Sequence, residues 1–124
     1  MDRNNSKVAD LYDAYHPVVI HMLAHLAQEM GSFDVELSVC GEIAGDPALA
    51  AVLVGMGYRC LSMSASSLLR VKWVLRRVTL SDLEDLVESA RQCQTSANCR
   101  ELVLSRLSGL GIGEVVNQPQ VLRA

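Results

Sequence analysis

The sequence predicts an α/β fold with parallel strands that forms part of a larger structure. Two short strands alternate with helices, and three further helices follow. The gap between the strands can hold a helix, and such a crossover implies parallel strands. A parallel sheet is covered on both faces and needs more than two strands. The 124 residues are also 50% hydrophobic, with a mean hydropathy of +0.21. We therefore expect apolar surface that other structure would cover.

The first helix is predicted over 17–30 and the first strand over 35–40. Pro17 suits the first helical position, and Gly31 can end the helix. The strand segment alternates with a period of two and ends at Cys40. The apolar residues of the helix fall on one wide face, which consists of Val19, Ile20, Met22, Leu23, Leu26, Ala27 and Met30.

A second helix and a second strand are predicted next. Asp46 and Pro47 have the residue types of a helix N-cap and of the first helical position. An apolar run follows, and Gly55 and Gly57 are interpreted as the signal that ends this helix. Residues 59–63 then form a short strand candidate.

The helix predicted over 66–78 has an apolar face and a basic face. Leu69 and Trp73 are four residues apart and lie on the basic side. The apolar arc consists of Leu68, Val71, Val74, Leu75 and Val78, and the basic residues are Arg70, Lys72, Arg76 and Arg77. We favour a solvated or ion-paired role for these cations over phosphate binding.

Two more helices are predicted over 81–93 and 97–107. Ser81 and Glu84 have the spacing of a capping box at the start of the first. Its inward residues are predicted to be Leu83, Leu86, Val87, Ala90 and Cys93, and those of the second helix Cys99, Val103 and Leu107. The tail that follows is predicted to be irregular.

Composition and charge argue against several classes of protein. The longest apolar run, 48–56, is about half of the roughly 20 residues that a membrane span needs. The first residues carry charges with no apolar stretch behind them, so no secretory signal is predicted. A net charge of −3 does not suit a nucleic-acid binder. We expect a cytoplasmic protein that binds neither membrane nor nucleic acid.

The cysteines and histidines do not predict a metal site. The four cysteines contain no C-x-x-C pair, and reduced thiols are expected. His21 and His25 have the spacing of a two-histidine metal face, but no third ligand follows at a recognised spacing. A solvated face is therefore favoured. His16 precedes Pro17 and is interpreted as a residue that starts the helix.

Cys40 occupies a position at which parallel α/β folds carry chemistry. Ligands in such folds lie beyond the carboxyl ends of the strands. Cys40 is the last residue of its predicted strand, and it lies on the face opposite Val35, Leu37 and Val39. A thiol there could act as nucleophile or acid, and Gly41 would allow close approach of the backbone. From position alone, a buried and inert cysteine is the favoured interpretation.

Several motifs occur in one order along the chain and together carry a family resemblance. They are Asp2-Arg3-Asn4-Asn5, Leu11-Tyr12-Asp13-Ala14-Tyr15-His16-Pro17, Cys40-Gly41-Glu42-Ile43-Ala44-Gly45-Asp46, Leu61-Ser62-Met63-Ser64 and Arg70-Val71-Lys72. This series resembles the C-terminal barrel of the enzymes that use phosphoenolpyruvate (PEP). The most similar branch is enzyme I of the bacterial phosphotransferase system, the PEP–protein phosphotransferases. Val71-Lys72-Trp73 is similar to the nitrogen-related branch.

The resemblance implies that residues 1–78 form about the last quarter of a (β/α)₈ TIM barrel. Residues 79–124 would be a C-terminal helical extension of the same domain. The family continues upstream of Met1, so the resemblance implies a fragment or a truncated gene product. Family members dimerise through this barrel, which makes Leu69 and Trp73 candidates for a contact surface. Packing of both under the C-terminal helices is the favoured alternative.

The resemblance also implies a mechanism. The family transfers the phosphoryl group of PEP to a histidine on a separate N-terminal domain, which passes it to a phosphocarrier protein, and releases pyruvate. Cys40 matches the proton donor to enolpyruvate, and Arg3 matches an arginine that binds the phosphate of PEP. A thiol suits the first role because its ordinary pKa, about 8.5, keeps it mostly protonated at neutral pH. Glu42 and Asp46 are assigned to loop and helix-cap structure.

Much of the family's machinery lies outside the chain. The Mg²⁺ ligands, the other phosphate-binding arginines and the phosphohistidine domain are all upstream of Met1. No Mg²⁺ is therefore expected to bind this chain alone, and the chain is predicted to be inactive alone, because phosphoryl transfer depends on metal and charge stabilisation. Two alternatives are a non-catalytic interaction or regulatory module derived from the barrel, and a fragment of pyruvate phosphate dikinase or PEP synthase.

Overall fold

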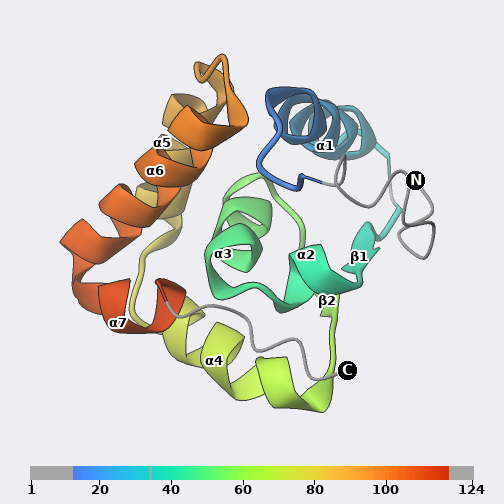
Figure 1. Ribbon diagram of the computed structural model, residues 1–124. Helices are drawn as coiled ribbons and strands as arrows, with labels where there is room; N and C mark the ends of the chain where they lie inside the picture. Colours follow the sequence, from blue (N-terminus) through green and yellow to red (C-terminus); the bar gives the residue numbers. More distant parts are fainter. Residues whose placement is uncertain (1–12, 34, 118–124) are drawn as a thin grey trace, which may run out of the picture.

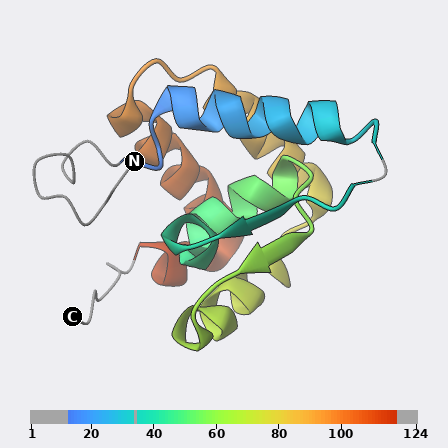
Figure 2. The same ribbon diagram turned by 90° about the vertical axis from the view of Figure 1, so that its right-hand side faces the viewer.

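The computed structural model describes residues 13–33 and 35–117, in which helices surround a central helix and two short parallel strands lie at one side (Figures 1 and 2). The elements are α1 (Pro17–Met30), β1 (Ser38–Cys40), α2 (Glu42–Gly45), α3 (Pro47–Gly55), β2 (Cys60–Ser62), α4 (Ala65–Leu75), α5 (Leu80–Arg91), α6 (Ser96–Leu107), the π-helical turn η2 (Ser108–Ile112) and α7 (Gly113–Val116). The strands are parallel, with Val39 opposite Leu61. The predicted parallel pair with a helical crossover is therefore confirmed.

The central helix, α3, is buried on all sides. Every residue from Pro47 to Leu53 is buried, and α4, α5 and α6 pack around the helix. Its start is fixed by Asp46, whose Oδ1 accepts hydrogen bonds from the backbone N–H groups of Ala48 and Leu49 at 2.9 and 3.0 Å. These bonds satisfy two of the N–H groups that a helix leaves without partners at its start. The predicted cap and helix are confirmed.

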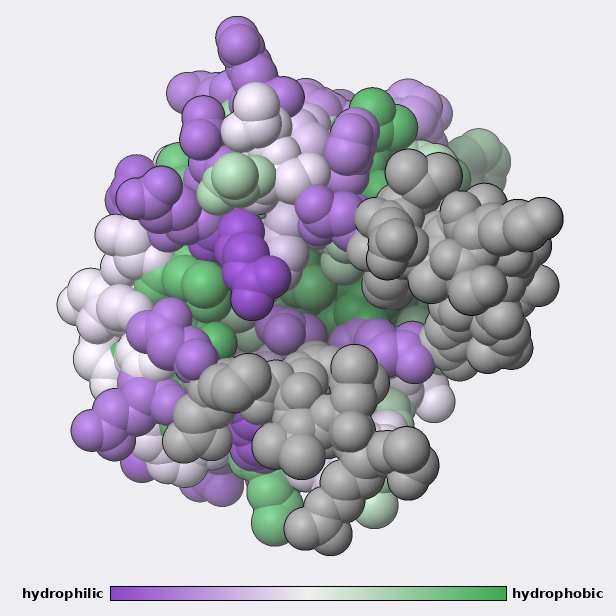
Figure 3. Space-filling view, viewed as in Figure 1, coloured by the Kyte–Doolittle hydropathy of each residue, from purple (hydrophilic) through white to green (hydrophobic). Residues whose placement is uncertain are grey.

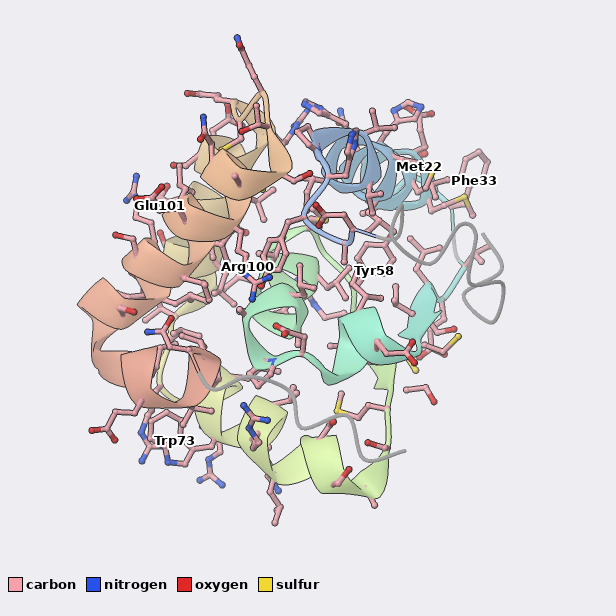
Figure 4. The ribbon with its side chains drawn as sticks, in the orientation of Figure 1. Met22, Phe33, Tyr58, Trp73, Arg100 and Glu101 are labelled. Atoms are coloured by element: carbon pink, nitrogen blue, oxygen red, sulfur yellow. The ribbon has the colours of Figure 1, made fainter. Side chains whose placement is uncertain are left out.

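Helix α1 has the predicted bounds but buries only part of the predicted face. His16 starts it, as predicted, since its Nδ1 accepts a hydrogen bond from the backbone N–H of Val18 at 3.2 Å. Ile20 is buried, whereas Met22 and Leu26 are 54% and 45% exposed. The predicted apolar face is therefore only partly buried, because α1 packs on α5 through the side opposite Met22 and Leu26, and no described element covers these two residues. Met22 points away from the core in Figure 4.

Strand β1 is shorter than the predicted strand over 35–40. Its partner β2 offers only three residues, so pairing is confined to Ser38–Cys40. Residues 36 and 37 have no ladder partner and lie outside the strand. The second strand is also shorter than its predicted range of 59–63. Just before it, the buried Tyr58 donates a hydrogen bond from its hydroxyl to the carbonyl of Leu23 at 3.0 Å, which joins this segment to α1 (Figure 4).

The start of α5 differs from the prediction. Thr79, rather than Ser81, is the N-cap residue. Its Oγ1 accepts from the backbone N–H of Asp82 at 3.2 Å, and Asp82 Oδ2 accepts from the backbone N–H of Thr79 at 3.0 Å. The capping box is thus formed two residues earlier, and the predicted pair of Ser81 and Glu84 is wrong. The box also lowers the pKa of the Asp82 carboxyl, because hydrogen bonds from Thr79 favour its charged form.

The inward faces of the last helices are largely as predicted. The buried residues are Leu83, Leu86, Val87 and Ala90 on α5 and Cys99, Val103 and Leu107 on α6, with Cys93 half-buried. After α6 the chain does not become irregular at once. Gly111 adopts φ +81 in η2 and redirects the chain into α7, which was not predicted. This segment places Ile112 and Val116 in the core.

The buried Cys99 predicts a loss of stability at alkaline pH. Burial and, to a lesser extent, the neighbouring Cys93 raise the pKa of its thiol from 9.0 to about 11. The unfolded chain loses this proton near pH 9 while the folded chain keeps it, so the free energy of unfolding should fall as pH rises from 9 to 11. Burial raises the pKa of Tyr15 as well, which extends the same trend to higher pH.

We expect Cys99→Ala to flatten this dependence between pH 9 and 11, as measured by urea unfolding at a series of pH values. Cys60→Ala is the matched control, because Cys60 is half-buried on β2 rather than enclosed in the core. An unchanged slope in Cys99→Ala would contradict the prediction.

Candidate functional site

Cys40 lies at the edge of the sheet where both parallel strands end. It is the last residue of β1 and is paired in register with Ser62, the last residue of β2. Its side chain is an exposed thiol. Because side chains alternate along a strand, Cys40 and Ser62 share one face while the half-buried Val39 and Leu61 share the other. The interpretation of Cys40 as a buried, inert cysteine is wrong in this structure, since the face that carries Cys40 has no described cover.

Gly41 turns the chain sharply from β1 into α2. Its φ of +87 lies in the left-handed region, which favours glycine. The carbonyl of Gly41 accepts hydrogen bonds from the backbone N–H groups of Ala44 and Gly45, both at 3.2 Å. Asp46 is the first residue after α2 and caps α3, which confirms the cap role predicted for it. Cys40 is therefore held between a strand pair and a hydrogen-bonded helical turn.

Serine hydroxyls lie beyond the end of the neighbouring strand. Ser64 is the N-cap residue of α4, and its Oγ lies 3.0 Å from Ser66 Oγ and 3.2 Å from Ser67 Oγ. Gly45 packs close to this turn, since a Cβ on it would lie 3.1 Å from Ser67 Oγ. Ser67 carries no sequence signal for this position, because only tertiary packing brings it against Gly45 of the Cys40 motif. This edge combines a thiol with hydroxyl groups that can bind a polar ligand.

The two candidate histidines of α1 do not lie at this edge. Arg3 lies outside the described residues. His21 and His25 are exposed on α1, as the favoured interpretation predicted. Nowhere in residues 13–33 and 35–117 do three His, Cys, Asp or Glu side chains group so that they could hold a metal ion. This part of the chain therefore does not fit a Mg²⁺ ion. The helices of the same part include none that is long and apolar enough to cross a membrane.

A separate groove of about 540 Å³ lies between α5 and α6, near Cys93 and Arg106. Two of its polar side chains bond to each other, since Arg106 Nη2 donates to Ser89 Oγ at 3.1 Å, and Ser89 Oγ donates in turn to the carbonyl of Asp85 at 2.9 Å. Figure 1 shows that these helices and the strands lie at opposite sides of the molecule. The groove is therefore distinct from the edge that carries Cys40.

Comparison with known proteins identifies the family. Residues 1–80 match the family described as PEP-utilising enzyme, PEP-binding domain. The Escherichia coli (strain K12) protein named "Phosphoenolpyruvate-dependent phosphotransferase system" is 38% identical over 116 residues, which cover 94% of this chain and 16% of the relative. The phosphoenolpyruvate-protein phosphotransferase of Borreliella burgdorferi is 43% identical over 86 residues, covering 69% of this chain and 15% of the relative. The phosphoenolpyruvate-protein phosphotransferase of Cupriavidus necator is 40% identical over 92 residues, which cover 74% of this chain and 16% of the relative.

These matches cover the C-terminal part of the relatives, and the chain spans only about 16% of the length of the Escherichia coli protein. The order of strands and helices agrees with a piece of a PEP-binding barrel domain. The chain therefore belongs to the PEP-utilising enzymes and is homologous to the C-terminal PEP-binding region of the PEP–protein phosphotransferases, enzyme I.

Proposed function

We propose that this chain forms the last quarter of a (β/α)₈ barrel in a PEP–protein phosphotransferase. Residues 1–78 would supply the last two strands with their helices, and 79–124 a helical extension on the outside of the barrel. Within the described residues β1 and β2 pair only with each other, so each has an edge available for a further strand. Helices α5 and α6 pack against α3, on the side of the molecule away from the strands, as such an extension would (Figure 1).

The proposed role of Cys40 is to protonate enolpyruvate. Transfer of the phosphoryl group from PEP leaves the enolate of pyruvate, whose methylene carbon must gain a proton. The Cys40 S–H would supply it: the new C–H bond forms as the enolate oxygen becomes a carbonyl, and the thiolate then takes a proton from water. The observation that carries this proposal is an exposed thiol at the carboxyl end of β1, beside Ser62, in a chain of this family.

The phosphate of PEP is assigned to Arg3, since the planar guanidinium group suits two phosphate oxygens at once. The substrates of the whole enzyme would be PEP and a protein histidine, with a phosphocarrier protein as the later acceptor. Mg²⁺ would be bound by residues upstream of this chain. The relatives named above are phosphotransferase proteins, which supports this reaction over that of a dikinase or synthase.

The proposal predicts that the chain is inactive alone and active in a complete enzyme. Incubation of the 124 residues with PEP and Mg²⁺ should give no pyruvate above background, because the described residues form no metal site. A chimera in which this chain replaces the matched segment of the Escherichia coli relative should phosphorylate its histidine and release pyruvate. The unmodified relative is the positive control. A folded chimera without either activity would favour a non-catalytic module, and turnover by the isolated chain would contradict the fragment interpretation.

A further inference from the structure

The outward face of α4 concentrates positive charge in a chain of net charge −3. No acidic residue occurs between Asp46 and Asp82, a stretch that includes the whole of α4. Lys72 and Arg76 are one helical turn apart, both are exposed, and neither side chain makes a hydrogen bond or ion pair within the part of the chain that the structure describes. For these two cations the favoured solvated role is confirmed, and an ion-paired role is not. Arg70 differs, because it is half-buried and its Nη2 donates a hydrogen bond to the carbonyl of Val115 at 3.0 Å.

Exposed apolar surface lies among these cations. Leu69 is 75% exposed, so its predicted packing under the C-terminal helices is wrong. Trp73 is half-buried against the core, and Arg77 stacks on it with its guanidinium carbon 3.7 Å from the ring centroid. Arg77 Nη1 also donates to the carbonyl of Trp73 at 3.2 Å. We call this surface the α4 patch: Leu69, Lys72, Trp73, Arg76 and Arg77.

The α4 patch points away from the core of the molecule. Val71 and Val74 face the core, and with 3.6 residues per turn Leu69, Lys72 and Arg76 project to the opposite side. In the barrel proposed above, whose helices form an outer ring, the neighbouring strands and helices would lie beside α4 and not over its outward face. Hydrophilic and hydrophobic side chains lie next to each other on the face of the molecule that Figure 3 shows.

We propose that the α4 patch binds an acidic protein segment that carries a large apolar side chain. Carboxylates would pair with Lys72 and Arg76, and the apolar side chain would cover Leu69 and the edge of Trp73. Aromatic and arginine side chains are the residues that most often dominate protein interfaces. A second copy docked symmetrically through the same patch would bring like charges together, which disfavours it as the occupant.

Fluorescence can test this directly, because Trp73 is the only tryptophan in the chain. The probe is a short synthetic peptide of glutamates with interspersed leucines, and the comparison peptide has glutamine in place of each glutamate. We expect a saturable change in Trp73 emission with the acidic peptide, weakened by added salt, and none with the glutamine peptide. No saturable change with the acidic peptide, or equal binding of the two peptides, would overturn the proposal.

Variants locate the binding on the chain. Arg76→Glu should weaken binding of the acidic peptide roughly tenfold, and Leu69→Ala should weaken it as well. Arg91→Glu is the matched control, because it makes the same charge change at an exposed position of α5 outside the patch. Equal affinities of Arg76→Glu and Arg91→Glu would contradict the proposal. Self-association of the chain in light scattering that is lost in Arg76→Glu would assign the patch to a second copy instead.

Discussion

Replacement of Cys40 by alanine in the chimera should abolish pyruvate release while leaving histidine phosphorylation much less affected. In the proposed mechanism phosphoryl transfer leaves enolpyruvate, and protonation of its carbon is the step that would need the Cys40 thiol. Loss of a positioned general acid costs roughly 10²–10⁴-fold in rate. The two steps are measured separately, by phosphohistidine formation from PEP and by pyruvate formation.

The control for this variant is Cys60→Ala. Cys60 starts β2 and is paired in register with Ser38, so it lies two positions away from the strand ends at which Cys40 and Ser62 lie. Its replacement should leave both steps close to those of the unmodified chimera. Cys40→Ser tests the acid more finely, because a hydroxyl has nearly the shape of the thiol but gives up its proton far less readily. Equal loss of both steps in Cys40→Ala would assign Cys40 to substrate binding or folding rather than to proton donation.

Structural features that depend on contacts between residues close in sequence could be predicted. The cap by Asp46, the helix start at His16 and the inward side of α6 all depend on contacts within one or two helical turns. The capping box of α5 shows the limit of such signals. Thr79 with Asp82 and Ser81 with Glu84 both have a suitable spacing, and only the structure shows that the first pair forms.

Features that depend on distant contacts could not be predicted. Periodicity marked Met22 and Leu26 as apolar, but burial depends on whether another element covers that side of α1. At the candidate site, alternation along the strand placed Cys40 on the correct face. Ser67 reaches the same edge only because Gly45 packs against it, a contact between residues 22 positions apart in sequence. No helical or strand periodicity relates positions 45 and 67, so the sequence pattern could not reveal that Ser67 lies at this edge.

Gly55 was interpreted as a residue that ends α3, and the structure gives it a second role with a large expected effect. It lies where α5 passes closest to α3. A Cβ on Gly55 would lie 2.8 Å from the carbonyl carbon of Leu83 and 2.9 Å from Val87 Cγ2. The first of these is a backbone atom in α5, which cannot withdraw without moving Leu83 and Val87 out of the core. The glycine is therefore required by the close approach of two helices.

Gly55→Ala should lower the free energy of unfolding by about 1–3 kcal/mol, the usual cost of overpacking a core. The measurement is urea unfolding followed by circular dichroism, with the slope compared to confirm that the same surface is exposed. Gly109→Ala is the matched control, because nothing lies within 4 Å of a Cβ at that position and its φ is not in the left-handed region. The control should leave stability unchanged or slightly raised, since alanine restricts the unfolded chain. If Gly55→Ala were as stable as the unmodified chain, α3 and α5 could not pack as closely as the structure has them, and the central position of α3 would be wrong.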